Sequence, residues 1–305
     1  MTKIAFSGYT GFIGKNFGDL LEDHSSPALA LLRQNKIANF REKEGSKLSF
    51  IRLSQNEEDI ISSLKGYDAF VHIAGKAHIK GKQASDFQSF MPDNVDLTLK
   101  MADYCQKAGV KKFVFVSTIG VHGYTTTNKD PFSVSDIPAP ITAYARSKLR
   151  AEELLKEFCE THNMILVIVR PPLVYSKTAP GNIASLKKAI LYKLPLPFGS
   201  ISNKRSIVTV SDLCMALKEA CETAKWDHSI MLPVSKTCST AEIISTLSKD
   251  IEEKAYLLNC PERFLRFIGK ITGKTYMIEQ LVGDLVITEN WLPSLSNKNH
   301  SEKAA

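Results

Sequence analysis

A glycine-rich turn near the amino terminus, Gly8-x-x-Gly11-x-x-Gly14, constrains the fold more than any other feature of the chain. Residues 3–8 form a short apolar run typical of a buried strand, and residues 9–23 place apolar side chains at helical spacing. Glycine at such a junction permits positive φ and lets the backbone approach a pyrophosphate at the helix N-terminus. The turn therefore predicts a dinucleotide-binding site. The expected contacts come from Gly8, Thr10, Gly11, Phe12, Ile13 and Gly14.

The rest of the first half alternates strands with helices. Strands are expected at residues 28–32, 48–53, 68–75, 111–120 and 164–172, and helices at 57–66, 94–109 and 149–163. Strands that are apolar throughout indicate a parallel sheet covered on both faces. The sequence thus predicts an α/β fold, a Rossmann-type doubly wound parallel sheet with a smaller C-terminal substrate-binding region.

The domain organisation is predicted from a change of composition: proline and glycine become frequent after Pro171 and Pro172. We expect an NAD(P)-binding domain over residues 1–170, to which 206–223 return. The substrate-binding region is assigned to 171–205 and 224–293. Residues 294–305 are small and polar and are expected to be a disordered tail.

Composition narrows the class of protein. The chain has 305 residues, 44% of them apolar, and a formal net charge of +7 spread over scattered lysines and arginines. Without a basic stripe interleaved with aromatic residues we expect no nucleic-acid partner, and an anionic small molecule is the simplest use of the charge. Six cysteines without a CxxC pair predict neither a metal site nor a disulfide framework. No signal segment or membrane-spanning run is recognised, which predicts a cytoplasmic protein without membrane insertion.

One amphipathic segment, "ERFLRFIGKITGK" at residues 262–274, allows two interpretations. It is typical of a helix whose apolar face packs inside a small substrate domain, which we favour here. The alternative is a helix that lies on a membrane surface.

The cofactor is predicted from the end of the second strand. A carboxylate there would accept from the ribose hydroxyls of NAD, whereas a cation would pair with the 2′-phosphate of NADP. The chain has Arg33 and Lys36 and no acid at this place, which favours NADP with NAD as the alternative. Arg33 could also be an ordinary solvated loop cation.

Three motifs in order, the glycine turn, "FVFVSTIGVHG" and "AYARSK", give the chain its family resemblance. It resembles the extended short-chain dehydrogenase/reductases that act on nucleotide sugars, from residue 3 to about residue 290. It is most similar to the UDP-4-keto-sugar reductases and 4-epimerases of bacterial O-antigen and capsule synthesis. The segments that carry this closer likeness are "IPAPITAYARSKLRAEELL", "VIVRPPLVYS", "GNIASLKKAI", "LPLPFGSISNKRSIVTVSDL" and "MLPVS".

The resemblance implies a catalytic trio of Thr118, Tyr144 and Lys148. Tyr144 would exchange the proton at C4 of the sugar, Lys148 would hold the nicotinamide ribose, and Thr118 would hydrogen-bond the C4 oxygen. An ammonium and a positive nicotinamide ring beside a phenol favour phenolate, so a lowered pKa is expected for Tyr144. Ser117 is the alternative to Thr118.

Other contacts are implied in the same way. Ala74 and Gly75 correspond to the turn where the backbone approaches the cofactor, and His78 would reach substrate or be a plain loop histidine. Two further residues, Asn182 and Arg205, would meet the substrate diphosphate, because a guanidinium offers forked donors to phosphate oxygens. A neighbouring cation, Lys204, is read as a solvated rim charge.

Three functions stay open at this point. The favoured one is reduction of the C4 ketone of a UDP-4-keto-6-deoxy-N-acetylhexosamine. The alternative is a UDP-hexose or UDP-N-acetylhexosamine 4-epimerase with tightly bound NAD, and the third is a non-catalytic NADP-binding sensor or scaffold. Dehydration is disfavoured, because Ile119 and Gly120 replace the acid pair of the dehydratase branch. The resemblance also implies a homodimer.

Overall fold

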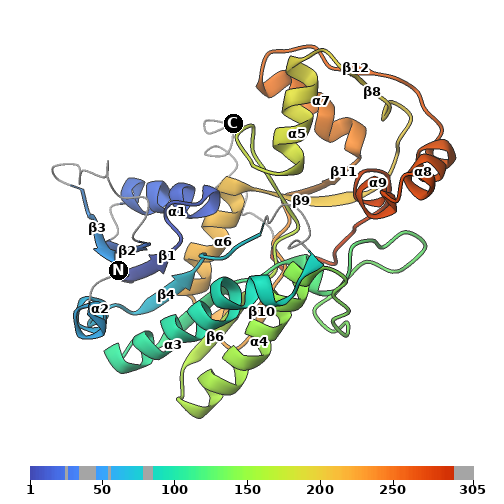
Figure 1. The fold of residues 1–305 in the computed structure, drawn as a ribbon. Helices are drawn as coiled ribbons and strands as arrows, with labels where there is room; N and C mark the ends of the chain where they lie inside the picture. The colour runs from blue at the N-terminus through green and yellow to red at the C-terminus, as the bar shows by residue number, and fades with distance from the viewer. Residues whose placement is uncertain (25–26, 34–45, 54–55, 78–84, 292–305) are drawn as a thin grey trace. The chain divides into compact units, whose positions relative to one another are not determined.

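The computed structural model describes residues 1–24, 27–33, 46–53, 56–77 and 85–291 (Figure 1). The chain divides into two compact units, which are described separately. The first unit comprises Met1–Val121, Pro138–Pro171 and Leu213–Met231. The second comprises His122–Ile137, Pro172–Asp212 and Leu232–Ala305.

A seven-stranded sheet forms the centre of the first unit. Its strands follow the order β10-β6-β5-β4-β1-β2-β3, and every neighbouring pair is parallel. The bounds are β1 (Ile4–Ser7), β2 (Ala28–Leu32), β3 (Leu48–Arg52), β4 (Ala69–His72), β5 (Lys112–Val116), β6 (Ile165–Val169) and β10 (Ile230–Met231). The order reverses between β1 and β4, where doubly wound sheets bind their ligands. The predicted fold class is confirmed.

Helices complete the first unit. They are α1 (Phe12–Asp23), α2 (Glu57–Leu64), α3 (Leu97–Ala108) and α4 (Ala143–Thr161), with α6 (Val210–Glu222) joining from Leu213. Short turns are η3 (Gln88–Phe90), η4 (Pro92–Asp96), η5 (Ile119–Val121) and η6 (Ala224–Trp226). Buried side chains of α2, α3 and α4 share one apolar core with the central strands. Strands β1, β2, β4 and β5 are buried at every position, which explains why they read as unbroken apolar runs.

The described residues of the second unit form two small sheets and four helices. One sheet has the order β11-β9-β7 and the other pairs β12 with β8. The strands are β7 (Leu173–Tyr175), β8 (Pro195–Leu196), β9 (Arg205–Thr209), β11 (Lys236–Cys238) and β12 (Tyr256–Leu257). The helices are α5 (Asn182–Leu191), α7 (Thr240–Asp250), α8 (Glu262–Ile271) and α9 (Thr275–Val282).

The unit boundaries differ in detail from the predicted domains. Strand β9 pairs with β7 and β11, so the chain returns to the first unit at Leu213 rather than at residue 206. Strand β10 pairs with β6 and places residues up to Met231 in the first unit. Residues 122–137 group with the second unit. A two-residue strand such as β10 is too short to leave a periodic pattern in the sequence.

Helix α8 contradicts the favoured interpretation of residues 262–274. Its apolar stripe, Phe264, Phe267, Ile268 and Ile271, is exposed instead of packed. None of the described helices is both long and apolar enough to cross a bilayer. The predicted disordered tail, residues 294–305, lies outside the described residues.

Candidate active site

The glycine turn of the sequence brings two loops of the first unit into close contact. Gly8 has φ of 89°, and a Cβ there would lie 2.7 Å from the backbone nitrogen of Ala74. At Gly14 a Cβ would lie 2.1 Å from the Gly8 oxygen, closer than any real side chain approaches backbone. Both positions therefore require glycine. The contact places the predicted Ala74 turn, which follows β4, beside the loop that follows β1.

Helix α1 begins in a way that suits a bound diphosphate. The Gly11 N–H donates to the Gly8 oxygen at 2.9 Å, which closes the turn, and Gly11 is the cap residue. None of the described side chains caps the helix, so its first N–H groups, including those of Phe12 and Ile13, are not taken by a side chain. Thr10 beside them is exposed. Backbone N–H groups at a helix N-terminus bind anions, so this turn fits a dinucleotide.

The end of β2 carries a cation that already has a partner. Arg33 forms an ion pair with Asp93 of η4, and the Lys76 ammonium lies 3.8 Å from the same carboxylate. The predicted role of Arg33 as the 2′-phosphate ligand would have to compete with Asp93. Lys36 lies outside the described residues. A carboxylate is therefore present at this end of the sheet, but η4 supplies it instead of β2.

Helix α4 presents Tyr144 and Lys148 from consecutive turns. The Thr142 hydroxyl accepts the N–H of Ala145 at 3.1 Å and caps the helix just before Tyr144. Positions four apart share a helix face, so the cap fixes where both side chains point. The Tyr144 ring lies 6.1 Å from the ring of Phe90, which borders it on η3.

The Lys148 ammonium is buried beside Gly75 of the loop that follows β4. Its Nζ lies 4.3 Å from the centre of the Phe115 ring, and a Cβ on Gly75 would come within 3.4 Å of it. Burial lowers the pKa of Lys148 to about 7, although Glu152 one turn further along α4 acts in the opposite direction. A residue larger than glycine at position 75 would press on this ammonium.

The Tyr144 phenol differs from the sequence-based expectation. Burial raises the pKa of Tyr144 to about 12, whereas we expected the neighbouring ammonium to lower it. The cause is desolvation of the buried phenol, which disfavours the charged phenolate. The other contribution that we expected, the positive nicotinamide ring, requires a bound cofactor.

The two hydroxyl residues after β5 have separate surroundings. Ser117 donates its hydroxyl to the Glu152 carboxylate, which also holds Arg170 at 2.5 Å, and all three side chains are buried. Thr118 is half-buried, and its hydroxyl accepts the N–H of Gly120 at 3.1 Å. A Cβ on Gly120 would meet both Thr118 and Ala145, so Thr118 faces the first turn of α4. Ser117 is therefore hydrogen-bonded to the buried Glu152–Arg170 pair, whereas Thr118 lies near the first turn of α4, which carries Tyr144.

The two predicted diphosphate ligands belong to the second unit. Asn182 is exposed at the start of α5, after Gly181 with φ of 72°. Arg205 is buried at the start of β9, where it donates to the Gly283 oxygen at 3.0 Å, and burial lowers its pKa. Lys204 is exposed, as expected of a rim charge.

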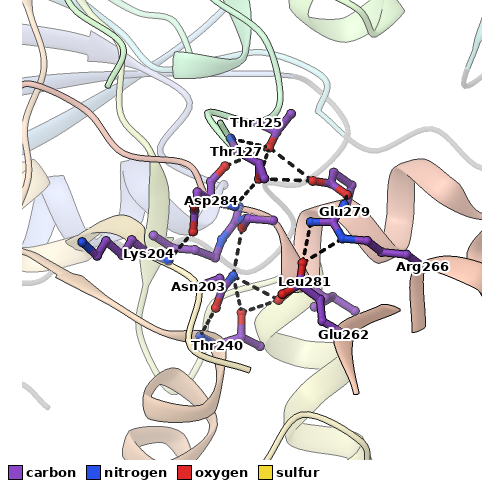
Figure 2. A network of polar contacts seen from close by, with 12 residues as sticks. Thr125, Thr127, Asn203, Lys204, Thr240, Glu262, Arg266, Glu279, Leu281 and Asp284 are labelled. Atoms are coloured by element: carbon purple, nitrogen blue, oxygen red, sulfur yellow. Dashed lines mark hydrogen bonds and ion pairs between the residues drawn. The ribbon is translucent and has the colours of Figure 1, made fainter. Parts of the chain in front are cut away.

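A polar network holds the loop that Arg205 contacts (Figure 2). The Asn203 side-chain amide donates to the oxygens of Leu281 and Gly283 at 3.2 and 2.9 Å, and its oxygen accepts the Thr240 N–H at 2.9 Å. Asp284 accepts the Lys204 N–H at 2.7 Å. The two residues before Arg205 are thereby tied to residues 281–284, and the Ser206 N–H donates to the Leu285 oxygen at 2.9 Å, so the backbone that carries the guanidinium is held on both sides.

Comparison with known proteins agrees with this geometry. The sequence profile of the NAD-dependent epimerase/dehydratase family matches residues 4–230. The chain belongs to that family.

Several epimerases are similar to this family member. The UDP-glucose 4-epimerase of Vibrio cholerae is 30% identical over 288 residues, covering 93% of this chain and 87% of that protein. The N-acetyl-alpha-D-glucosaminyl-diphospho-ditrans,octacis-undecaprenol 4-epimerase of Escherichia coli O157:H7 is 22% identical, covering 74% and 70%. The crystal structure of a UDP-glucuronic acid 4-epimerase from Bacillus cereus with NAD superposes with a TM-score of 0.69, at 25% identity, covering 85% and 88%.

One residue of this epimerase/dehydratase site, Asn94, was missed by the sequence analysis. Its side chain is fully buried, accepts the Lys76 N–H at 2.7 Å and donates to the Lys76 oxygen at 3.1 Å and to the Ser147 hydroxyl at 2.9 Å. The Ser147 hydroxyl in turn donates to the oxygen of Tyr144 at 2.7 Å. Asn94 thus joins the loop after β4 to helix α4, which carries Tyr144 and Lys148. Its π-helical setting in η4 left no signal in the sequence pattern.

Two further expectations concern residues or groups near the site. His78 lies outside the described residues. Over the part of the chain that the structure describes, no cluster of histidine, cysteine and carboxylate side chains could hold a metal ion.

Proposed function

We propose that the chain is a UDP-hexose or UDP-N-acetylhexosamine 4-epimerase that keeps NAD bound through its cycle. The observation that carries the proposal is the 30% identity to a UDP-glucose 4-epimerase over 87% of that protein's length, combined with Thr118, Tyr144 and Lys148 around one helix start. The reductase that the sequence favoured was supported in part by Arg33 as an NADP ligand, besides the missing dehydratase acids and the likeness to the reductase branch. The ion pair between Arg33 and Asp93 weakens that argument.

The mechanism follows from the positions of the three side chains. The glycine turn and Lys148 would hold NAD, which would supply reversible hydride exchange with C4 of the sugar and so no net oxidation. The Tyr144 phenolate would take the C4 hydroxyl proton as the alcohol is oxidised and give it back as the ketone is reduced. Thr118 would hold the C4 oxygen in line with the phenol. Lys148 would bind the ribose of the cofactor and favour the phenolate.

The low pKa of Lys148 gives this mechanism a second requirement. An ammonium with a pKa of about 7 is only partly charged at neutral pH, and a phenol with a pKa of about 12 stays protonated there and so cannot accept a proton. Hydrogen bonds to the ribose hydroxyls of a cofactor would favour the Lys148 ammonium and raise its pKa. The positive charge of the nicotinamide ring would favour the Tyr144 phenolate and lower its pKa. Tyr144 and Lys148 are therefore proposed to reach their active protonation states only in the cofactor complex.

The substrate side is proposed to be a glycosyl diphosphate. A guanidinium such as that of Arg205 suits phosphate oxygens, and its buried, fixed position would orient the diphosphate with little entropic cost. The exposed Asn182 at an uncapped helix start would add an amide donor. UDP is the carrier that the Vibrio cholerae relative suggests.

A second candidate is the NADPH-dependent reduction of a UDP-4-keto-6-deoxy-N-acetylhexosamine. The observation in its favour is that β2 itself ends in a cation and offers no carboxylate to the ribose. Hydride would then pass once, from NADPH to the C4 carbon, with Tyr144 supplying the proton to the oxygen.

One experiment separates these functions. Purified protein is incubated with UDP-glucose or UDP-N-acetylglucosamine without added cofactor, and the products are resolved by chromatography. The epimerase proposal expects interconversion with the C4 epimer and no net nicotinamide absorbance change, and a loss of about 10²- to 10⁴-fold in Tyr144→Phe. Stoichiometric NADPH oxidation with the 4-keto substrate, and no interconversion, would replace it with the reductase. If neither reaction occurs while NAD or NADP still binds, the non-catalytic function stands.

A paired substitution tests which hydroxyl acts. Thr118→Ala is expected to lower kcat with little change in thermal stability. Ser117→Ala is expected to lower thermal stability, because it removes a donor from the buried Glu152 carboxylate. The reverse pattern would assign the catalytic role to Ser117.

A further inference from the structure

Helix α8 of the second unit exposes the face that an amphipathic helix normally buries. Phe264, Phe267, Ile268 and Ile271 are 54%, 57%, 37% and 70% exposed. Their spacing of i, i+3, i+4 and i+7 places them along one side of the helix as a continuous stripe. Single exposed apolar residues are ordinary on a protein surface, whereas a stripe over two turns calls for a partner. We name these four residues the α8 stripe.

The opposite side of α8 packs against the rest of the second unit, and this packing keeps the α8 stripe on the surface. Leu265 and Gly269 are buried, and a Cβ on Gly269 would come within 3.0 Å of the Ile278 side chain on α9. Gly269 therefore lets the two helices approach closely. The stripe cannot turn inward without breaking this packing.

Ion pairs on the inner side reinforce the same orientation (Figure 2). Arg266 reaches Glu262 on its own helix at 2.7 Å and also pairs with Glu279 of α9. Glu279 is nearly buried and accepts from the hydroxyls of Thr125 and Thr127 at 3.3 and 3.4 Å. These contacts use the carboxylates on the inner side of the helix pair.

The exposed side of α8 carries cations next to the stripe. Arg263 and Lys270 are seven positions apart and so fall on the same flank of the helix, and both are exposed. The one carboxylate of α8, which the structure describes throughout, is Glu262, and it pairs with Arg266. Lys274 follows the helix, and α9 adds exposed Tyr276 and Met277. The exposed surface is thus apolar at its centre and positively charged at its edge.

We propose that α8 docks the protein on an anionic phospholipid surface, with the α8 stripe among the acyl chains and Arg263 and Lys270 at the headgroups. A helix with a large apolar face and cations on its flank lies in the plane of a bilayer interface. Anionic headgroups attract each nearby lysine or arginine, whereas an apolar protein groove would offer the two cations no partner. This docking is peripheral and does not depend on the proposed epimerase activity.

Vesicle binding of the full-length chain tests the proposal. The probe is vesicles of equal parts phosphatidylcholine and phosphatidylglycerol, separated from free protein by flotation. Wild type is expected to float with these vesicles and to do so less as salt rises. Phe267→Ser combined with Ile271→Ser is expected to weaken partitioning at least about tenfold, because two apolar side chains no longer enter the interface. Arg263→Glu with Lys270→Glu is expected to abolish the preference for anionic over pure phosphatidylcholine vesicles.

A matched control separates the stripe from exposed apolar residues in general. Tyr192 is 76% exposed on the same unit, at the end of α5, and Tyr192→Ser is expected to leave flotation unchanged. Thermal unfolding followed by circular dichroism checks that every variant is folded. Equal flotation of wild type, the stripe variant and Tyr192→Ser would overturn the proposal. The proposal would also be overturned if the stripe variant changed the oligomeric mass of the protein in solution but not its flotation. Helix α8 would then be a contact between copies of the chain.

Discussion

At the scale of single residues, the site depends on charged groups that the fold keeps in unfavourable surroundings. Lys148 is buried over an aromatic ring and Arg205 is buried against a backbone oxygen. Burying a charge costs free energy unless the group is fully paired. Buried charges of this kind are frequent at functional sites. Each is expected to lower the free energy of unfolding by a measurable amount.

The free-energy cost of burying the Lys148 side chain should depend on pH. Its pKa is about 7 in the folded chain and 10.5 when exposed, so the unfolded chain binds more protons between these values. The free energy of unfolding should then rise with pH across this window, by about 1 kcal/mol per pH unit. Lys148→Met removes this dependence. Urea denaturation should find the variant more stable than wild type near neutral pH, with the advantage shrinking as the pH approaches 10.5. Parallel pH profiles would contradict the buried ammonium.

Cofactor choice should respond to Asp93. Asp93→Asn removes the partner of Arg33 and the negative charge that a 2′-phosphate would meet. We expect the affinity for NADP relative to NAD to rise about tenfold, a change typical of one charge-assisted contact. Titration calorimetry on cofactor-free protein measures the ratio. Asp96→Asn, an exposed acid of the same turn, is the control and should leave the ratio unchanged.

At the scale of elements, sequence reasoning succeeded where a pattern was long and failed where it was short or ambiguous. The alternation of apolar strands and helices predicted the doubly wound sheet, and the glycine spacing predicted a close approach that Gly8 and Gly14 display. Periodicity also found the α8 stripe. It could not say which way the stripe faces, because an apolar face looks the same whether a domain or a membrane covers it. Asn94 was missed because one buried amide has no periodicity.

The buried ion pair beneath α4 gives a prediction at the element scale. Glu152→Ala leaves the Arg170 guanidinium buried without its carboxylate, which should lower the free energy of unfolding by about 3–5 kcal/mol. Glu153→Ala removes the neighbouring acid, whose pair with Arg150 is exposed, and should cost less than about 1 kcal/mol. Urea denaturation of both variants tests the contrast. Similar losses would mean that the buried pair adds nothing beyond a surface one.

At the scale of the whole molecule, the six cysteines report how tightly each region is packed. Cys105, Cys159, Cys214 and Cys221 are buried, and burial raises the pKa of each thiol, that of Cys159 to about 12. Cys238 and Cys260 are only half-buried, although burial raises the pKa of the Cys238 thiol as well.

Thiol titration should therefore divide the six into two classes. A thiol must be accessible and deprotonated to react, so native protein is expected to react with an aromatic disulfide reagent at Cys238 and Cys260 and slowly elsewhere. All six should react in denaturant. Rapid reaction of the four buried thiols in native protein would contradict the packing. The homodimer implied by the resemblance remains a prediction, for which light scattering is the measurement.

The stripe of α4 that carries Tyr144 and Lys148 continues at the same spacing to Glu152, whose partner Arg170 follows directly on β6. Tyr144, Lys148 and the carboxylate of the buried Glu152–Arg170 pair are thus carried by one continuous helix. Beyond its first turns the helix is held by Ala151, Leu155 and Cys159 in the apolar core. Amide protons in this central part should exchange with solvent only when the whole unit opens, so heat should melt the helix and the unit together.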